Sequence, residues 1–564
     1  MNKVKVYTAD FETNVSDENI QAEQTDVWLF DICDIDTYTH TTGNTIDDFF
    51  TAVKDLRQSI IYFHNLKFDG SFILDYLLKN GYKHTTSNKL KMHEFSTIIS
   101  DMGMFYSIKV RFNNQQKKAK LECEFRDSMK KINGTVEQIA KDYNLPILKG
   151  SIDYKIKRTN PYTPTQEEIA YIHNDTEIIA RVLNMQYSLG MTQLTTASDT
   201  YNDYKKFCGR TYKLLFPILD IETDDFIRLS YRGGVCMVAP QFQNRVLNDV
   251  VVYDVNSMYP DKMCRCDLPY GRPKYYKGKY VPCDTYPLYI QRIQVCCKVK
   301  QGYYPTILIR ATRLSFKDYL TDTDGMMLEL TLTSADMELL FKHYDVYDIK
   351  YLDGYMFMAS KNLFRKYLLP IYEKKCTTKG AEKQLNKLKL NALYGKFASN
   401  PRHYSKIPYL ENNKVKYHNS ECEIGKPIYT AVSCFITSYA RKQLFNAIQN
   451  NFDIFVYCDT DSVHLLKEVN NIPIDDKRLG DWKLEKVYKK AKYLAQKTYF
   501  GDKGNKNDIK IAGAPKNIKD VLTFDKFDFG FTANGKLLPK TVNGGVILYS
   551  TEFTIKERKK NVKN

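Results

Sequence analysis

The stretch from Ile454 to Leu466, IFVYCDTDSVHLL, constrains the fold most, because two aspartates interrupt an otherwise apolar segment. The apolar runs on both sides predict two strands joined by a bend. Asp and Ser favour turns through hydrogen bonds to nearby backbone, so the segment could be an ordinary hairpin bend. On a strand-turn, residues i and i+2 face one way, so Asp459 and Asp461 could instead form a paired-carboxylate site.

A strand near the N-terminus also carries paired acids. In VKVYTADFET, Asp10 and Glu12 lie two residues apart on a predicted strand and project to the same side. Asp69 lies near the start of a predicted helix, and Tyr171 and Asp175 are four residues apart on another, so they share a face. Each acid alone could be a turn or surface residue. Together they could hold divalent ions such as Mg²⁺, which favour oxygen ligands and assist attack on a phosphodiester.

A further acid, Asp254, ends a predicted strand in VVVYDVNSMYP. Turn-forming residues follow it, and Pro260 suits the first turn of a helix. An acid between a strand and a turn is accessible to ligands. With Asp459 and Asp461 it would form a second two-metal site.

The segment KGAEKQLNKLKLNALYGKF predicts an amphipathic helix. Polar side chains share one face: Lys383, Lys387, Asn391 and Tyr394. Apolar side chains fill the other: Leu385, Leu388 and Ala392. We expect Gly395 to cap this helix. The helix could be an ordinary solvated surface element, but cations and a flat ring also suit a nucleoside triphosphate.

The composition favours a nucleic-acid partner. The 564 residues suffice for three or four domains, and 83 Lys and Arg against 66 Asp and Glu give a net charge of +17. With 43 Tyr and 30 Phe, the chain has both cations for phosphates and rings that stack on unpaired bases.

The cysteines predict neither a disulfide framework nor a zinc site. There are 13, an odd number without any CxxC pair, which is typical of reduced intracellular thiols. The densest group fits no standard zinc spacing: Cys264, Cys266, Cys283, Cys296 and Cys297. No signal peptide and no membrane span are expected, because no run of 18 apolar residues occurs.

In order along the chain, these motifs resemble those of the replicative family B DNA polymerases, and among them the protein-primed branch of phi29-like phages. DFET, NLKFDG and the Tyr171/Asp175 spacing resemble three exonuclease motifs. DVNSMYP, KLKLNALYGK, YCDTDS and KTY resemble the polymerase motifs, with YRGG between the two sets.

The resemblance implies a multidomain α/β and α+β fold. A DnaQ-like, RNase H-like 3′–5′ exonuclease domain would span residues 1–190, and a right-hand polymerase domain 191–564. Within the latter it implies a palm at 191–265 and 425–500, a first insertion at 266–361, fingers at 362–401, a second insertion at 402–424 and a thumb at 501–564.

The resemblance also implies roles for single residues. In the exonuclease, the expected metal ligands are Asp10, Glu12, Asp69 and Asp175. Tyr171 would orient the attacking water, Lys149 would assist, and Asn65 and Phe68 would contact a single-stranded 3′ end.

In the polymerase half, the expected metal positions are Asp254, Val255 and Asp459, with Asp461 close by. The expected nucleotide contacts are Tyr259, Lys375, Lys387, Asn391 and Tyr394. The expected DNA contacts are Tyr231, Gly233, Gly234, Lys497 and Tyr499.

By the same resemblance we expect two Mg²⁺ per active site, with Mn²⁺ accepted, and a DNA template-primer and dNTPs as substrates. The partner would be a terminal protein that primes synthesis, and the polymerase would be a monomer or a heterodimer with that protein. The protein would replicate a linear phage genome with proofreading and strand displacement in the cytoplasm of the infected host cell. Two alternatives remain: a family B polymerase primed by nucleic acid, and a non-catalytic nucleic-acid-binding scaffold.

The segment HYSKIPYLENNKVKYHNSECEI predicts a hairpin that turns at Glu411-Asn412-Asn413, because asparagine tolerates the positive φ of tight turns. It has few apolar side chains, so we expect it to project from the body rather than join a core. It could be an idle surface hairpin or could close over DNA.

Overall fold

The computed structural model describes residues 4–87, 89–112, 121–153, 156–158, 162–309 and 318–557. The N-terminal unit is built on a mixed eight-stranded sheet of order β3-β2-β1-β4-β8-β7-β6-β5. The strands are β1 (Lys5–Thr13), β2 (Val27–Asp34), β3 (His40–Gly43), β4 (Ser59–Phe63), β5 (Lys83–His84), β6 (Glu94–Ile99), β7 (Phe105–Arg111) and β8 (Glu122–Asp127). The helices are α1 (Asp17–Ala22), α2 (Ile46–Asp55), α3 (Leu66–Lys79), α4 (Val136–Asp142) and α5 (Gln166–Ser188).

Helices cover both faces of this sheet, and the alternation along β1 decides what each face receives. Phe11 joins an aromatic core with residues of α2 and α3. Val6 packs on the opposite face with Ile178 and Val182 of α5. Because side chains alternate along a strand, Asp10 and Glu12 share the α5 face with Val6.

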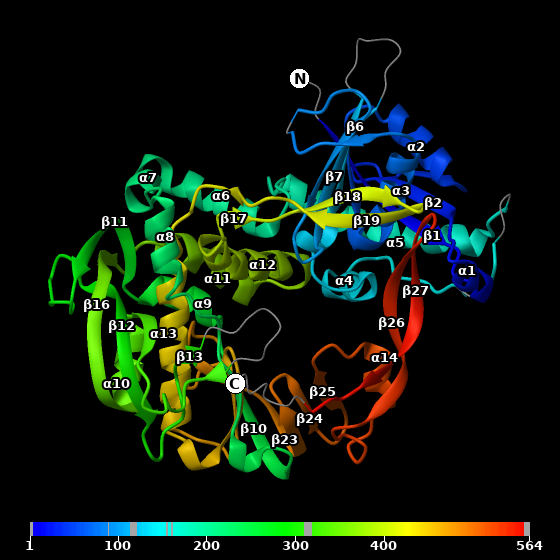
Figure 1. The fold of residues 1–564 in the computed structure, drawn as a ribbon. Coiled ribbons are helices and arrows are strands. Elements are labelled where there is room, and N and C mark those ends of the chain that lie inside the picture. Colours follow the sequence, from blue (N-terminus) through cyan, green and yellow to red (C-terminus); the bar gives the residue numbers. More distant parts are fainter. Residues whose placement is uncertain are drawn as a thin grey trace.

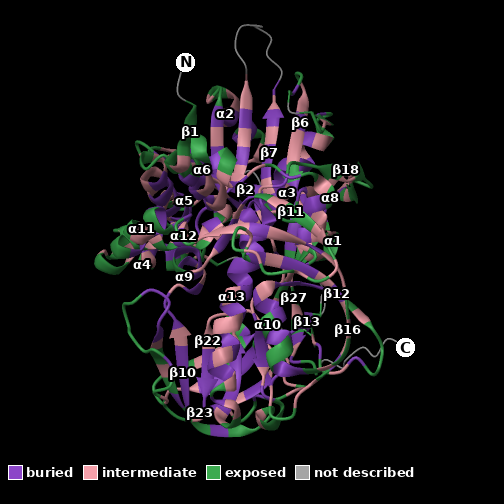
Figure 2. Cartoon of the chain, turned by 90° about the vertical axis from the view of Figure 1, so that its left-hand side faces the viewer, coloured by how far each residue is buried: buried purple, intermediate pink, exposed green. Residues whose placement is uncertain are grey.

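The second unit contains an antiparallel seven-stranded sheet of order β25-β24-β23-β10-β22-β21-β9. The strands are β9 (Cys236–Val238), β10 (Val246–Val255), β21 (Phe455–Asp459), β22 (Ser462–Leu465), β23 (Trp482–Ala495), β24 (Thr498–Asp502) and β25 (Asn507–Ile511). Helix α13 (Thr430–Gln449) packs against it through Leu444 and Ile448. Figure 2 shows α13 as a largely buried helix in the middle of the unit.

A smaller sheet and a helical layer complete the second unit. The sheet has the order β11-β16-β12-β15, and α10 packs on it. Its elements are β11 (Leu268–Lys277), β12 (Leu288–Val299), β15 (Leu328–Thr333), α10 (Ser334–His343) and β16 (Tyr344–Ser360), with the short pair β13 (Leu308–Ile309) and β14 (Asp318–Tyr319). The helical layer comprises α6 (Thr196–Cys208), α7 (Tyr212–Leu215), α8 (Ile221–Arg228), α9 (Met258–Arg265), α11 (Arg365–Thr377) and α12 (Gly380–Phe397).

Short 3-10 helices occupy Ser128–Lys130, Gly209–Thr211, Pro240–Phe242 and Phe452–Ile454. Within the described part of the chain, no helix combines the length and the apolarity that a membrane crossing requires.

Two hairpins reach from the second unit to the first. One contains β17 (Arg402–His403), β18 (Lys406–Glu411), β19 (Lys414–Asn419) and β20 (Glu423–Ile424); the other contains β26 (Thr532–Val542) and β27 (Gly545–Thr554), and is preceded by α14 (Lys516–Val521). Figure 1 shows β26–β27 rising along one side of the molecule to the N-terminal unit, where the β18–β19 hairpin also lies. Both hairpins touch Glu23, which accepts hydrogen bonds from Lys414 and Lys540.

The β18–β19 hairpin turns where the sequence predicts, with Asn412 and Asn413 at φ 51° and 58°. The expectation that it joins no core is wrong. Val415 is only 3% exposed and packs into the aromatic core of the N-terminal unit, with Tyr417 beside it. The hairpin has few apolar residues, but it directs them onto another unit of the chain, which its own sequence does not reveal.

The seven-stranded sheet extends to Ile511 through β24 and β25. It therefore continues past residue 500, where the expected palm ends and the expected thumb begins. The cause is the β23–β24 turn, which returns the chain alongside β23 and keeps it in the sheet.

Candidate active sites

The first acidic cluster lies on the α5 face of the N-terminal sheet. Asp10 and Glu12 come from β1, Asp69 from the first turn of α3, and Asp175 from the middle of α5. Asp10 and Glu12 share the face of β1 on which α5 packs, so they and Asp175 lie on the same side of the sheet. The charge of Asp10 acts on both Glu12 and Asp69. The structure thus brings together acids that are 165 positions apart between Asp10 and Asp175.

These carboxylates repel one another in a buried setting. Burial and the charge of Asp175 raise the pKa of Asp10 to about 7. Burial and the charge of Asp10 raise the pKa of both Glu12 and Asp69 well above their ordinary values. One oxygen each of Asp69 and Asp175 is buried without a hydrogen-bond partner among the described residues. A donor set of this kind fits hard divalent cations.

Lys149 provides positive charge at the edge of the cluster. Its Nζ donates a hydrogen bond to Oδ2 of Asp175 and lies 5.0 Å from the centroid of the Tyr171 ring. Asn65 is exposed at the start of α3 with φ 82°, and Phe68 is half-buried one turn later against Phe72. The structure therefore places the residues expected for this site around the first turn of α3 and the N-terminal half of α5, beside β1.

The second acidic cluster lies where β10 meets the β21–β22 hairpin. Asp254 on β10 and Asp459 on β21 both pair with Ser462 of β22, and Asp461 lies in the turn. The three acids line one cavity of about 570 Å³. Burial and Asp461 raise the pKa of Asp254 to about 7, and burial raises that of Asp461 to about 6. Glu485 of β23 lines the same cavity and was not among the expected residues.

Lys497 and Val255 are close neighbours of the acids of the second cluster. Lys497 donates a hydrogen bond to Asp459 over 2.6 Å, so Lys497 is an ion-pair partner in the cavity. The Val255 side chain is only 1% exposed, and its N–H donates to the Asp461 carbonyl. Val255 can therefore serve a metal only through its own carbonyl oxygen.

Tyr499 is placed differently from the expected DNA contact. It is only 7% exposed and packs against the rings of Tyr457 and Tyr493. The reason is that β24 is an inner strand between β23 and β25, so its alternate residues face the core. Tyr499 supports the cavity wall, because it also lines the cavity.

A group of aromatic and basic residues adjoins the second cluster. The ring centroids of Tyr259 and Tyr394 lie 4.2 Å apart. Burial raises the pKa of both tyrosines, and the negative charge of Asp461 also raises it. Nζ of Lys375 donates to Oγ of Ser257 over 2.9 Å. Burial and neighbouring lysines, Lys387 among them, lower the pKa of Lys375.

Helix α12 carries three of the expected nucleotide contacts: Lys387, Asn391 and Tyr394. Lys387 and Asn391 are exposed, as the helical pattern predicts. The expected buried face is only partly right, because the side chains that the helix buries are Leu385, Leu390, Leu393 and Phe397. Gly395 lies inside the helix and does not cap it: its φ is not positive, so it does not adopt the left-handed conformation of a helix cap, and the helix continues to Phe397.

The YRGG segment, Tyr231 to Gly234, touches the turn between the two aspartates. A Cβ on Gly234 would lie 3.0 Å from the Thr460 side chain, and the N–H of Thr460 donates to the Val235 carbonyl over 2.7 Å. Tyr231 packs near Tyr394, and Gly233 is exposed. The absence of a side chain at Gly234 therefore lets this segment lie close to Thr460.

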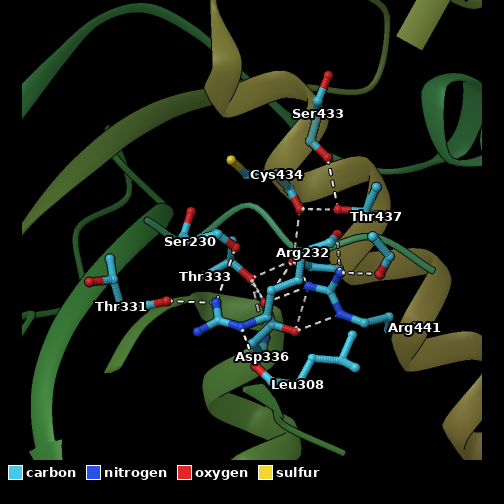
Figure 3. Close-up of polar contacts among 12 residues, drawn as sticks. Ser230, Arg232, Leu308, Thr331, Thr333, Asp336, Ser433, Cys434, Thr437 and Arg441 are labelled. Carbon is cyan, nitrogen blue, oxygen red and sulfur yellow. Dashed lines mark hydrogen bonds and ion pairs between the residues drawn. The ribbon is translucent and has the colours of Figure 1, made fainter. Parts of the chain in front are cut away.

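A buried ion pair, drawn in Figure 3, is hydrogen-bonded to the backbone of the YRGG segment. Arg441 of α13 pairs with Asp336 of α10 over 2.7 Å and donates hydrogen bonds to the carbonyls of Arg232 and Gly233 over 2.6 and 3.2 Å. Sequence reasoning missed Arg441 and Asp336, because they are 105 positions apart and belong to no local motif.

Comparisons with known proteins agree with this architecture. Residues 53–477 match the family model described as DNA polymerase type B, organellar and viral. The chain is 39% identical to the DNA polymerase of Bacillus phage phi29, with 98% of this chain and 99% of the relative covered. It is 34% identical to that of Streptococcus phage Cp-1, with 98% of each covered. The structure of phi29 DNA polymerase complexed with primer-template DNA superposes with a TM-score of 0.92 at 38% identity, covering 98% of this chain and all of that one.

Proposed function

Because the chain belongs to the type B DNA polymerases of organelles and viruses, and so is a DNA polymerase, we propose that it also proofreads and copies a linear phage genome from a protein primer. The family and the multidomain α/β and α+β fold class expected from the motifs are confirmed by these similarities. Enzymes of this family act on DNA and deoxynucleoside triphosphates with divalent metal ions. The observation that carries the proposal is the presence of two separate acidic clusters in two units of the chain.

The N-terminal unit, residues 1–190, is the proposed 3′–5′ exonuclease. Asp10, Glu12, Asp69 and Asp175 would hold two Mg²⁺ ions, which supply positive charge for the developing oxyanion. Tyr171 would orient the water that attacks the terminal phosphodiester, and Lys149 would stabilise the charge from the side. The raised pKa values and the unpartnered oxygens in this cluster support a cation site.

The second unit is the proposed polymerase. In synthesis the primer 3′-hydroxyl attacks the α-phosphate of the dNTP in line, a phosphodiester forms, and pyrophosphate leaves. Asp254 and Asp459 would hold two Mg²⁺, or Mn²⁺, with Asp461 beside them. Lysine, tyrosine and asparagine side chains beside these acids would bind the nucleotide: Lys375, Lys387, Asn391, Tyr394 and Tyr259.

We assign the subdomains as expected from the motifs, with one shift. The palm comprises 191–265 and 425–511, because the central sheet ends with β25; the thumb then begins at 512. The first insertion is 266–361, the fingers 362–401 and the second insertion 402–424. Tyr231, Gly233 and Gly234 lie in the palm, between the exonuclease motifs and the polymerase motifs in the sequence, and are proposed DNA contacts.

The two hairpins support processive strand displacement. The second insertion and the β26–β27 hairpin both end on the N-terminal unit, where Lys414 and Lys540 share Glu23. We propose that, together with the body, they enclose a path for DNA in front of the palm. DNA threaded through such a path is retained without high affinity, and a downstream duplex must separate to enter.

Protein priming is the finer part of the proposal. The first insertion forms a separate sheet with its own apolar core, and we propose that this part of the chain receives a terminal-protein partner. The relatives are phage proteins, so the protein would act in the cytoplasm of the infected host, as a monomer or with that partner. Priming by nucleic acid is the alternative. The scaffold hypothesis predicts missing acids, whereas all seven acids are present and gathered in two clusters.

The test is synthesis on a primed single-stranded circle with dNTPs and Mg²⁺. The expected product exceeds the length of the circle, because synthesis must then displace its own strand. The Asp459→Ala variant is the matched control and should give no product. A parent enzyme that stops after one circle would refute strand displacement, and one that gives no extension would refute the polymerase assignment.

A further inference from the structure

A cluster of two histidines and one aspartate lies outside both active sites. Asp31 comes from β2, His40 from the start of β3, and His173 from α5. One ligand atom of each lies within 4.8 Å of the others. The imidazole rings stack with centroids 3.9 Å apart, and Glu177 lies one turn beyond His173, with Oε2 3.7 Å from Nε2 of His40.

The hydrogen bonds within this cluster leave two of its buried polar atoms without a hydrogen-bond partner among the described residues. Asp31 is fully buried, and its Oδ2 accepts hydrogen bonds from His40 Nδ1 over 2.8 Å and Thr176 Oγ1 over 2.5 Å. Its other oxygen, Oδ1, has no hydrogen-bond partner among the described residues, and neither has Nε2 of His173. These two atoms face each other at 3.6 Å.

The separation of those two atoms suits a shared metal ion. Tetrahedral zinc with ligand bonds of about 2.0–2.2 Å places neighbouring ligand atoms about 3.4 Å apart. A direct hydrogen bond would need about 2.9 Å. The observed 3.6 Å is too long for the hydrogen bond and close to the metal-bridged distance.

We propose that Asp31, His40 and His173 form a binding site for a divalent transition-metal ion of the zinc class, with Glu177 positioned to supply a fourth ligand. Imidazole nitrogen suits zinc, copper, nickel and iron, whereas magnesium prefers oxygen ligands. The site therefore differs in chemistry from the two acidic clusters. Because it requires no polymerase or exonuclease step, it stands independently of the proposed function.

A purely hydrogen-bonded cluster explains the arrangement less well. It would satisfy His40 and one oxygen of Asp31 and leave the other oxygen buried and unpaired, which is costly. Protonating both histidines would place two like charges in stacked rings. A metal ion satisfies the free oxygen and the free nitrogen together.

The site would link three elements of the N-terminal unit. Asp31 lies directly opposite Asp10 in the β1–β2 register, and α5 carries His173 two residues before Asp175. A bound ion would fasten α5 to β2 and β3 at the back of the acidic cluster. Its expected effect is to stabilise the N-terminal unit against heat.

The experiment is a zinc titration of the full-length chain, freed of metals and kept in excess Mg²⁺ so that the carboxylate clusters are occupied. Calorimetry should show one zinc site per chain. The variants His40→Gln and His173→Gln, checked for folding by circular dichroism, should each weaken binding by at least about a hundredfold, because losing even an outer partner of a ligand costs 10- to 100-fold. His403→Gln, which removes an exposed histidine of β17, is the matched control and should bind zinc like the parent.

Substituting Co²⁺ for Zn²⁺ tests the ligand atoms even if a variant fails to fold. The parent should show the visible bands of a site with nitrogen and oxygen ligands. Thiolate charge-transfer bands would assign the metal to some of the 13 cysteines and overturn the proposal. Displacement of zinc by Mg²⁺, or parental zinc affinity in both histidine variants, would overturn it as well.

Discussion

Replacing Gly234 by alanine should slow nucleotide incorporation by pushing on the turn between Asp459 and Asp461, the proposed catalytic acids. The new Cβ would lie 3.0 Å from Cγ2 and Oγ1 of Thr460, whereas ordinary contact begins at 3.4 Å. The two segments must therefore separate by about 0.4 Å. Thr460 lies between Asp459 and Asp461 and is itself held by a hydrogen bond to Val235, so the displacement passes to the acids.

The magnitude follows from the sensitivity of reaction geometry. A misplacement of about 1 Å can cost about 10²-fold in rate, so 0.4 Å should cost about sixfold, or about 1.1 kcal/mol of transition-state stabilisation. The rate of single-nucleotide addition, measured by rapid quench at saturating dNTP, should fall by this factor. Degradation of single-stranded DNA should change little, since the other acidic cluster lies in another unit.

Two further variants separate a steric clash from general damage. Gly425→Ala is the matched control, because its Cβ would meet its nearest neighbour at an ordinary 3.5 Å. Adding Thr460→Gly to Gly234→Ala removes every atom in the clash and suits the φ of 62° at that position. The double variant should recover activity relative to Gly234→Ala. A normal rate in Gly234→Ala, or no recovery in the double variant, would refute the reasoning.

Four other predictions follow from the two sites and the hairpins. Asp254→Ala should abolish nucleotide incorporation but leave 3′–5′ degradation intact, and Asp10→Ala with Asp69→Ala should do the reverse; loss of both activities from either change in a folded protein would contradict separate sites. Tyr259→Val should increase ribonucleotide incorporation, because the ring beside Tyr394 would otherwise exclude a 2′-hydroxyl; unchanged selectivity in primer extension would argue against this role. Deleting residues 402–424 should leave single-nucleotide addition near normal, but it should shorten products on long templates and stop synthesis at a downstream duplex. Undiminished rolling-circle product from the deletion variant would disprove the role of this hairpin in strand displacement. Without metal, the melting temperature should fall as the pH rises from about 4 to 7. The pKa values of Asp10 and Asp254 are raised to about 7 in the folded state, so in this window the folded state binds more protons than the unfolded state. Mg²⁺ should restore more stability at pH 8 than at pH 5, and a melting temperature independent of pH in chelator would contradict the raised pKa values.

The sequence alone determined the local elements on which the sites are built. Alternation predicts the strands of Asp10 and Asp254, and the apolar runs around Asp459 and Asp461 predict their hairpin. Two asparagines predict the turn of the β18–β19 hairpin. These features depend on backbone preferences and side-chain periodicity, which residues close in sequence decide. The ordered motifs also sufficed to indicate the polymerase family.

Only the tertiary structure decided which residues meet across the chain. It paired Lys497 with Asp459 and turned Tyr499 into the sheet core. It also placed Val415 of the β18–β19 hairpin in the core of another unit, and Gly234 against Thr460. Such contacts arise from long-range packing between elements whose own sequences do not record their partners. For the same reason the cluster of Asp31, His40 and His173, gathered from two strands and a helix, has no signature in the sequence.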